Sequence, residues 1–330
     1  MAATTETHPG DKHEIPEYEA HESSTSLKER IKKHYEIASD YYYSLWGQHI
    51  HHGYFISPTE TKEEAQVNLI KYLLEISDLP RGAAVLDVGC GIGGTSRFLA
   101  KEHACGVTGI TISGRQVEIA TKLTRVETEA LGNDTTASPS PDAGTNAYPS
   151  GGNCRFIELD AEKMLEHFSA GGGGVPTAQF DAVWISEALS HFPDKPLFFR
   201  SASELLVPGK SSRLVIADWF KAPQLTPEQE KEDIQPIEDG MLLPQLCTAD
   251  QYVEMARNAG LKIRQGPIDI SRDVAKTWDI SWGLVSSPSL WLFAISQGRD
   301  GLAFLQAFRA MQRGYANGTF RYAIMCFEKP

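Results

Sequence analysis

Residues 83–100, AAVLDVGCGIGGTSRFLA, restrict the fold of this chain more than any other stretch. An apolar run ends in Asp87, glycine-rich residues follow, and helix-compatible residues resume at Thr95. This order predicts a strand, a glycine turn and the start of a helix. Such a unit points backbone N–H groups and the positive end of a helix at a bound ligand. The turn contains Gly89, Gly91, Gly93 and Gly94.

The glycines by themselves fit two kinds of ligand. Gly89, Gly91 and Gly94 match the G-x-G-x-x-G spacing of a dinucleotide-binding loop. Asp87, however, would repel a pyrophosphate and favour a ligand that carries an ammonium group. The next predicted strand ends at the uncharged residues 111–113 and lacks the acidic residue that holds a nicotinamide ribose. These observations favour an S-adenosylmethionine site.

The composition is that of a protein with a sizeable core and no membrane span. The chain has 330 residues, 41% of them hydrophobic, and no apolar run of the roughly 18 to 20 residues that cross a bilayer. Its net charge of −12 disfavours nucleic acids and anionic membranes as partners. The 5 cysteines are scattered and never in C-x-x-C spacing, which predicts neither a disulfide framework nor a zinc site and suits a reducing cytoplasm.

Alternating strand and helix patterns predict a doubly wound α/β sheet. Residues 132–152, rich in Gly, Pro, Ser and Asn, predict a surface insertion between two of its elements. We expect a seven-stranded Rossmann-like sheet with helices on both faces. The expected strands cover residues 83–87, 106–112, 155–159, 180–185, 213–217, 261–270 and 320–328.

The segments around this core predict a lid and a cap. Residues 1–25 are polar, without an apolar leader, and predict a disordered tail. Residues 26–60 carry aromatic residues at helical spacing, which predict a helical lid. Tryptophan-rich helical residues between 219 and 312 predict substrate cap elements over the catalytic face. The lid also holds a run of three histidines, His49, His51 and His52, which could bind a metal or line a substrate mouth; without a nearby cysteine or carboxylate cluster, we expect no metal.

Ligands of an open α/β sheet bind at the carboxyl ends of its strands, so polar residues there are candidates. Asp87 is expected to bind the cofactor, although it could only cap the turn. Gln116 could approach a ribose or complete a capping box with Ser113. Asp160 could pair with an adenine amino group or cap the following helix. The candidates at successive strand tips are Asp87, Thr111, Ile112, Ser113, Asp160, Ser186, Glu187, Asp218 and Trp219.

Residues 185–191, ISEALSH, are a second candidate for chemistry. If a helical turn starts directly after the strand, Glu187 and His191 lie four residues apart on one face. A carboxylate beside an imidazole can hold a general base ready to take a proton from a hydroxyl or an amine. The alternative is that Glu187 bonds the backbone and His191 only shapes the pocket wall.

Aromatic residues of the lid and cap could form the walls of a substrate pocket. Methyl transfer from a sulfonium disperses charge, so a dry, aromatic-lined cavity and correct positioning supply much of the acceleration. Aromatic faces would also attract a cationic cofactor. The alternative for such residues is an ordinary core position, which we expect for about half of them. The residues expected in the substrate pocket are Trp46, His52, Trp219 and Trp282.

Several motifs together resemble a known family. VLDVGCGIGG, GVTGITIS and FDAVWISEALSHFPD are similar to motifs of the class I S-adenosylmethionine-dependent methyltransferases. WGQHIHHGYF, LLPQLCTADQYV and MQRGYANGTFRYAIMCFEKP narrow the resemblance to the tocopherol methyltransferase-like branch, which is related to sterol and ubiquinone-pathway methyltransferases. The resemblance covers residues 31–330 apart from the insertion.

The resemblance implies which residues bind the cofactor. The N-terminal helix would act as a lid over it, and the tryptophan-rich C-terminal part would form the acceptor pocket. The implied contacts are Asp87, Gly89 and Gly91 for the methionine part, Thr111, Ile112 and Gln116 for the ribose, and Asp160 and Ala161 for the adenine. Gly93, Ser186 and Tyr35 complete the expected cofactor-binding set.

The resemblance leaves the methylated atom open, because members of this branch methylate carbon, nitrogen or oxygen on apolar acceptors. The insertion and the absence of a transit peptide make tocopherol itself a poor candidate. We expect a cytoplasmic enzyme of specialised metabolism, a homodimer, that methylates an oxygen or nitrogen of a hydrophobic natural product, with His191 and Glu187 as catalytic residues. The alternatives are C-methylation of a phenolic or sterol-like ring, and a non-catalytic binding protein that keeps the cofactor fold.

Overall fold

The computed structural model describes residues 27–32, 35, 36, 39, 43, 46–131, 146–169, 179–285 and 298–330. The side chains of residues 146, 281–285 and 300 are outside this description. The expected tail, residues 1–25, and the first part of the expected insertion, residues 132–145, also lie outside the described residues.

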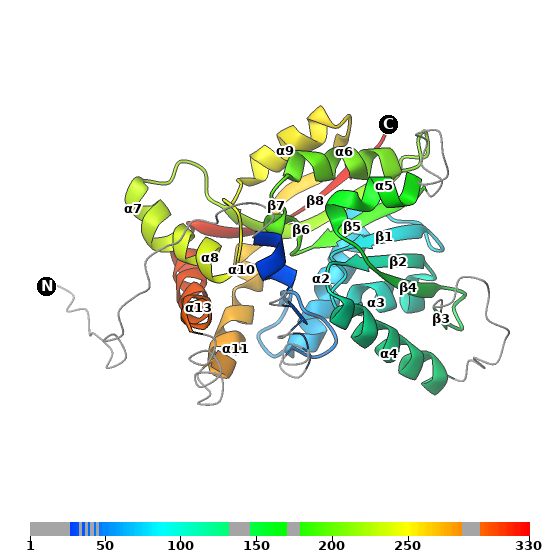
Figure 1. Cartoon of the computed structure of the whole chain (residues 1–330), viewed down its shortest axis with the longest axis horizontal. Coiled ribbons are helices and arrows are strands. Elements are labelled where there is room, and N and C mark those ends of the chain that lie inside the picture. The colour runs from blue at the N-terminus through cyan, green and yellow to red at the C-terminus, as the bar shows by residue number, and fades with distance from the viewer. Residues whose placement is uncertain are drawn as a thin grey trace, which may run out of the picture.

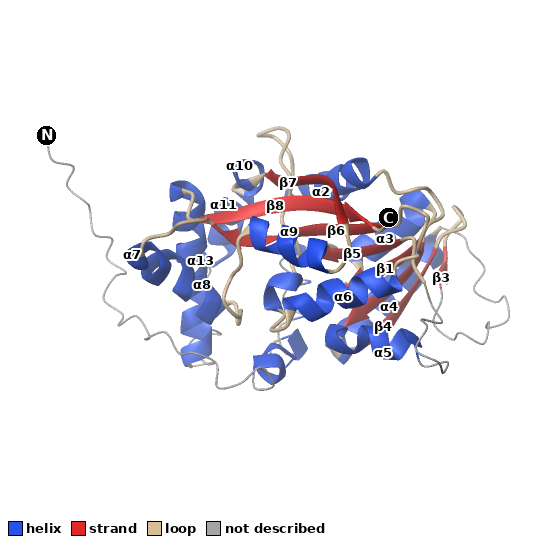
Figure 2. Ribbon diagram, turned by 90° about the horizontal axis from the view of Figure 1, so that it is seen from above, coloured by secondary structure: helices blue, strands red, loops and turns tan. Residues whose placement is uncertain are grey.

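One twisted sheet runs through the molecule, with the order β3-β4-β2-β1-β5-β6-β8-β7 (Figures 1 and 2). The seven expected strands are present, which confirms the Rossmann-like α/β fold. The strands are β1 (Ala84–Val88), β2 (Gly106–Thr111), β3 (Asn146–Ala147), β4 (Asn153–Glu158), β5 (Ala182–Ser186), β6 (Arg213–Lys221), β7 (Lys262–Asp269) and β8 (Phe320–Glu328).

The strand directions place a ligand site at the end of β1. Strands β4, β2, β1, β5 and β6 are parallel to one another, whereas β8 runs antiparallel between β6 and β7. From β1 the chain moves outward through β2 to β4, and then returns to β5 on the other side of β1. A crevice opens where the strand order reverses in this way, and ligands of α/β sheets bind there. The glycine turn after β1 lies at this position.

The eighth strand, β3, was not expected. It lies within the predicted insertion and pairs antiparallel with β4 at the sheet edge. The pairing is anchored by Tyr148, which is only 3% exposed and donates a hydrogen bond to Glu127 of α4. The last part of the predicted insertion is therefore attached to the sheet, because a buried tyrosine holds it there.

Helices cover both faces of the sheet (Figure 1). On one face, α2 contacts β6, β7 and β8, and α3 and α4 contact β2 and β4. On the other, α5, α6 and α9 pack with apolar residues of β1, β5 and β6 into a second core layer. The helices are α2 (Lys62–Ser77), α3 (Gly94–His103), α4 (Gly114–Ala130), α5 (Met164–Ser169), α6 (Lys195–Leu205) and α9 (Ala249–Asn258).

Capping boxes start three of the helices. Thr61, Thr226 and Thr248 each accept a hydrogen bond from the backbone N–H three residues on, and the side chain of that residue accepts a hydrogen bond from the backbone N–H of the threonine. Each box satisfies two otherwise unpaired backbone donors. None of the described helices combines the length and apolar character that a bilayer crossing requires.

The cap is a group of helices beyond the carboxyl ends of β5 and β6, at the left of Figure 1. Helix α13 packs against α8, and α11 packs against α13. Within the predicted cap range, however, α9 and β7 belong to the sheet layers. The cap elements are α7 (Pro227–Gln229), the π-helical turn Glu230–Ile234, α8 (Gln235–Gly240), α10 (Ser271–Val274), α11 (Lys276–Val285) and α13 (Arg299–Asn317).

The N-terminal segment, defined here as the described residues between 27 and 46, is helical and lies between the cap and the sheet (dark blue in Figure 1). Leu27 and Ile31 are buried against Leu242, which follows α8, and Tyr35 and Ile112 pack against this cluster. Because Ile112 follows β2, the segment bridges the cap and the half of the sheet that carries the glycine turn.

Candidate active site

The glycine turn after β1 brings a buried carboxylate to the crevice. Asp87 is 3% exposed and accepts a 2.5 Å hydrogen bond from Ser96 Oγ of α3. Burial raises the pKa of Asp87 to about 6, although the Ser96 bond opposes the shift. Gly89 has a φ of +70°, and a Cβ there would lie 2.4 Å from the Cβ of Ala188. Only glycine fits this turn, and a cation beside Asp87 would restore the charged form of the carboxylate.

A cavity of about 840 Å³ opens beside the turn and holds most of the residues predicted to bind the cofactor. Asp87 lines a smaller adjoining cavity of about 360 Å³, which shares Ile50, Gly89, Gly91 and Ser186 with the larger one. Gly93 lines neither; it precedes α3, and a Cβ there would strike the ring of Phe156. The predicted residues along the larger cavity are Tyr35, Gly89, Gly91, Thr111, Ile112, Gln116, Asp160, Ala161 and Ser186.

Of the two cofactor residues with a capping role as the alternative, Asp160 serves that role and Gln116 does not. Ser113 caps α4 by accepting from the backbone N–H of Gln116, but the Gln116 side chain accepts from Thr111 Oγ1 at 2.5 Å and does not close the box. Asp160 accepts from the backbone N–H of Glu162 and caps a 3-10 turn. Its other carboxylate oxygen lies 3.0 Å from Lys28 Nζ. Both side chains still line the cavity, so a cap and a ligand contact are compatible.

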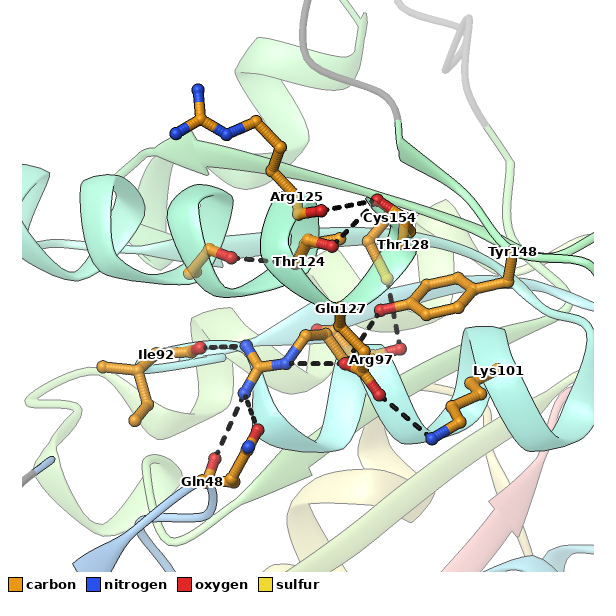
Figure 3. A network of polar contacts seen from close by, with 12 residues as sticks. Gln48, Ile92, Arg97, Lys101, Thr124, Arg125, Glu127, Thr128, Tyr148 and Cys154 are labelled. Atoms are coloured by element: carbon orange, nitrogen blue, oxygen red, sulfur yellow. Dashed lines mark hydrogen bonds and ion pairs between the residues drawn. The ribbon is translucent and has the colours of Figure 1, made fainter. Parts of the chain in front are cut away.

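The histidine-rich loop, defined here as residues 48–52, is held against the glycine turn by a network of polar contacts (Figure 3). Arg97 of α3 is 2% exposed and donates to the carbonyl of Ile92 at 2.6 Å and to Gln48 Oε1 at 3.1 Å. Its Nε lies 3.5 Å from the carboxylate of Glu127. A Cβ on Gly94 would lie 2.1 Å from the carbonyl oxygen of Gln48. The absent side chain at Gly94 and the guanidinium of Arg97 thus let the loop that carries the histidines approach α3.

A second cavity, of about 770 Å³, lies between the cap, the N-terminal segment and the ends of β5 and β6. Its walls are mainly aromatic and aliphatic, and three of the predicted pocket residues, Trp46, His52 and Trp219, line it. The side chain of Trp282 lies outside the described residues. Residues that line both large cavities are Ile31, Tyr35, Ile50, Glu187 and His191. The two cavities therefore adjoin, and the shared wall contains the residues predicted for catalysis.

The hydrogen-bond partner of Glu187 is His52. The helical turn that would place Glu187 and His191 on one face does not start directly after β5. Glu187 has a φ of +53° and precedes a 3-10 turn, Leu189–His191. Its carboxylate accepts from His52 Nδ1 at 2.9 Å, from the His52 backbone N–H at 2.6 Å and from Tyr322 Oη at 2.8 Å. Burial opposes ionisation, but the charge and hydrogen bonds of His52 hold the pKa of Glu187 below its usual value. The left-handed backbone conformation of Glu187 directs its carboxylate toward His52.

His191 lies instead among aromatic rings. Its ring centroid is 6.2 Å from that of Tyr35 and 6.2 Å from that of Trp219. Asp218, another predicted strand-tip candidate, faces away from the cavities and accepts a 3.0 Å hydrogen bond from Tyr252 of α9. The described residues contain no group of three His, Cys, Asp or Glu side chains placed to bind a metal ion.

Several residues of the cavities were not singled out from the sequence. Tyr322 on β8 reaches the site only because β8 inserts beside β6. Lys28 closes the rim of the cofactor cavity through its ion pairs with Asp160 and Glu162. The walls of the second cavity that were not among the expected pocket residues are Ile50, His51, Met241, Leu242, Trp278, Phe304 and Phe308. Of these, His51 belongs to the histidine run that could line a substrate mouth, and Ile50 and Leu242 lie in motifs that carry the family resemblance.

Sequence identity to two methyltransferases shows the family of this chain. The chain is 30% identical to 2-methyl-6-phytyl-1,4-hydroquinone methyltransferase of Synechocystis over 75% of this chain and 70% of the relative. It is also 30% identical to 27-O-demethylrifamycin SV methyltransferase of Amycolatopsis mediterranei, over 75% and 79% of the two chains. The chain belongs to the class I S-adenosylmethionine-dependent methyltransferases. This methyltransferase is also 29% identical, over 92% of its length and 79% of the relative's, to a probable chloroplastic tocopherol O-methyltransferase of Oryza sativa subsp. japonica, as the resemblance to that branch implied.

Family models and solved structures agree with this assignment. Residues 22–137 match the model for mycolic acid cyclopropane synthetase, and residues 86–212 match that for a methyltransferase domain. The methyltransferase superposes on the cyclopropane synthase MmaA2 of Mycobacterium tuberculosis with a TM-score of 0.68 and 18% identity, covering 92% and 98% of the two chains. It superposes on the [4+2]-cyclase SpnF with a TM-score of 0.66 and 21% identity, covering 92% and 96%. At these identities the superpositions show the shared fold alone.

The cavities fit the methyl donor of this family, S-adenosylmethionine. Asp87, whose pKa burial raises to about 6, is mostly ionised at neutral pH and would bind the cationic methionine end. The polar pair Thr111 and Gln116 and the carboxylate of Asp160 line the larger cavity that adjoins the space beside Asp87. When bound, the cofactor supplies an activated methyl group on a sulfonium.

Proposed function

We propose that this enzyme methylates an oxygen or nitrogen of a hydrophobic small molecule that binds in the aromatic cavity. The observation that carries the proposal is the shared wall: the cavity with the predicted cofactor residues and the aromatic cavity meet at Tyr35, Glu187 and His191. A donor and an acceptor in these two spaces would meet across that wall. The expected cytoplasmic location and homodimer stay predictions.

The residues have distinct proposed roles. Asp87, with Gly89 and Gly91, binds the methionine part of the cofactor. Trp219 and Trp278, which are 8% and 5% exposed, exclude water and orient a planar acceptor. In a dry cavity of this kind, positioning and hydrogen bonds to the reacting group are worth more than they are in water. The names of the relatives include O-methyltransferases as well as enzymes of other specificity, which supports an apolar acceptor of moderate size.

The proposal is tested with a labelled methyl group. The full chain is incubated with methyl-labelled S-adenosylmethionine and a panel of apolar phenols, polyketides, terpenoid alcohols and amines, and NMR of the product identifies the methylated atom. We expect O- or N-methylated products. Trp278→Ala should raise KM for the acceptor about tenfold or more while leaving the Kd of S-adenosylmethionine unchanged.

The other outcomes point to the two alternatives. A methyl group on a ring carbon would replace the proposal with C-methylation of a phenolic or sterol-like ring. Binding of S-adenosylmethionine without transfer to any member of a broad panel would favour a binding protein that keeps the cofactor fold.

A further inference from the structure

Three aromatic rings surround the ring of His52, and two of them, Trp219 and Trp278, line the aromatic cavity with it. Within the described part of the chain, the buried atoms His52 Nε2, Trp219 Nε1, Trp278 Nε1 and Tyr315 Oη make no well-aligned hydrogen bond, although the Trp278 side chain acts on the Tyr315 hydroxyl. Their rings form a compact group: the His52 centroid lies 5.9 Å from Trp219, 5.0 Å from Trp278 and 6.2 Å from Tyr315. We call these four residues the polar cluster. Unpaired buried polar groups are destabilising, so such a cluster suggests a ligand that completes it.

The hydrogen bond from His52 to Glu187 determines which atom of the imidazole is available. An ionised carboxylate only accepts, so His52 Nδ1, at 2.9 Å from Glu187 Oε2, carries the proton. In the neutral form of the ring, which is the form that can act as a base, the lone pair is on Nε2. The His52 backbone and Tyr322 also donate to Glu187, which holds the carboxylate in place. The imidazole is thus oriented by an anchored acid, and its acceptor atom belongs to the polar cluster.

The polar cluster therefore contains one acceptor, His52 Nε2, and three donors, the two indole N–H groups and the tyrosine O–H. A hydroxyl group can pair with the acceptor and with one of these donors. It can donate its hydrogen to the imidazole, accept from an indole with one lone pair, and keep the other lone pair for attack. A neutral amine has a single lone pair, which attack would use, so the indole donors would gain no partner.

We propose that the polar cluster binds the reacting hydroxyl of the acceptor and that His52 takes its proton during methyl transfer. This inference rests on the proposed function and deepens it by choosing oxygen. In the balanced step, the O–H proton moves to His52 Nε2 and the oxygen bonds the methyl carbon. The C–S electron pair returns to sulfur, which leaves S-adenosylhomocysteine. The resulting imidazolium is stabilised by the ionised Glu187, and the indole N–H groups stabilise charge that develops on the oxygen.

The test compares His52→Gln with wild type on an acceptor alcohol or phenol from the panel. The glutamine amide can still donate to Glu187 but has no basic nitrogen. We expect kcat to fall roughly 10²- to 10⁴-fold, with KM for the acceptor and the Kd of S-adenosylmethionine within threefold of wild type. Glu187→Gln should lower kcat about tenfold. Trp278→Phe, which removes one donor and keeps a ring, should lower kcat about five- to tenfold. His167→Gln, on the exposed side of α5, is the matched control with unchanged kcat.

The pH profile separates a base from a structural role. A base acts only when unprotonated, so wild-type kcat should rise to a plateau as pH increases. The titratable groups that face the His52 ring are Glu187, His51, Tyr315 and Tyr322. The rise should disappear in His52→Gln and persist in His191→Gln. An unchanged kcat and pH rise in His52→Gln, or loss of the rise in His191→Gln alone, would overturn the inference.

NMR tests the protonation of His52 Nε2 without any need for turnover. The full chain is labelled with ¹⁵N-histidine and saturated with S-adenosylhomocysteine, and the signals of His52 are identified by their loss in His52→Gln. In wild type these signals should show a protonated Nδ1 and an unprotonated Nε2, and addition of the acceptor should shift the Nε2 signal. A protonated Nε2 in the neutral ring contradicts the proposal. If wild type transfers no methyl group to any acceptor, the proposed function fails, and this spectrum still decides the state of His52. Transfer to nitrogen or carbon alone would preserve the methyltransferase and reject the hydroxyl.

Discussion

Asp87 combines a stability penalty with a proposed binding role. Burial raises the pKa of its carboxyl from 3.8 to about 6, so the folded protein holds this proton more tightly than the unfolded chain. Its contribution therefore destabilises the ligand-free protein progressively as pH rises from about 4 to about 6, by up to about 3 kcal/mol. Above that range the ionised carboxylate is available to a cation.

Asp87→Asn should separate these two effects. At pH 7 to 8 the ligand-free variant should be more stable to thermal or urea unfolding than wild type, and at pH 4 the difference should vanish. Calorimetry should show that wild type binds S-adenosylmethionine more tightly as pH rises through about 6, whereas the variant binds about 10- to 100-fold more weakly at neutral pH. The control is Asp218→Asn, because burial also raises the pKa of Asp218 to about 6, but this residue lines none of the three cavities, whereas Asp87 lines the smallest of them. Equal affinities for Asp87→Asn and wild type would contradict the role.

Arg97 shows how much one buried cation organises at the residue scale. Arg97→Met would leave the Ile92 carbonyl and Glu127 without this donor and release Gln48 from α3 (Figure 3). A buried acceptor that loses its donor costs about 1 to 3 kcal/mol, and Glu127, which is 28% exposed, keeps its pair with Lys101, so we expect a loss of about 2 kcal/mol in urea unfolding. Arg125→Met changes a 63% exposed side chain of α4 that pairs with Glu129, and it should cost less than about 0.5 kcal/mol. Similar losses in the two variants would show that the network is not what holds the loop.

At the scale of elements, the N-terminal segment is attached to the cofactor cavity by one polar face. Lys28, Lys32 and Glu36 are four residues apart and contact Asp160, Glu158 and Ser113 respectively. These pairs are partly exposed and individually weak, so the segment is held by several small, salt-sensitive contributions.

Lys28→Ala should therefore speed the release of bound S-adenosylhomocysteine. We expect a several-fold higher dissociation rate in stopped-flow measurements, and a wild-type rate that rises with ionic strength, because salt screens the same pairs. Lys163→Ala, an exposed lysine in the 3-10 turn that Asp160 caps, should leave the rate unchanged. Identical rates in Lys28→Ala and wild type at low salt would argue against closure by this face.

At the scale of the whole molecule, one helical segment joins the two binding spaces. Ile31 is 7% exposed, lines both cavities, and packs with Leu242 of the cap and Ile112 of the sheet. A ligand that orders this segment from one cavity lowers the cost of ordering it from the other. We therefore expect S-adenosylhomocysteine to lower the Kd of the acceptor at least fivefold. The acceptor should lower the Kd of S-adenosylhomocysteine by the same factor.

Ile31→Ala should reduce that factor by half or more in calorimetric titrations of each ligand with and without the other. Ile263→Ala, which truncates a 44% exposed side chain on β7, is the control and should keep it. A coupling factor of one in wild type, or an unchanged factor in Ile31→Ala, would show that the cavities act independently.

Local patterns were enough for the features that depend on neighbours in the chain. The glycine turn, the strand-tip residues, the capping boxes at Thr61, Thr226 and Thr248 and the seven main strands follow from spacing and periodicity, which act over a few residues. The expectation that Glu187 pairs with His191 had the same local basis. It did not hold because Glu187 adopts a positive φ, which directs the carboxylate away from the short helical turn.

The sequence by itself determined three features: the turn that contains Asp87 and the glycines, the methyl donor of the enzyme, and the family to which the chain belongs. Motifs of contiguous residues carry each of them. Only the tertiary structure decided that His52, 135 residues before Glu187, is its partner, and that Tyr322 supports the pair. These contacts depend on β8 inserting beside β6 and on Arg97 and Gly94 admitting the histidine-rich loop to α3. No local pattern encodes such pairings, because they are set by the packing of elements that meet only in the folded chain.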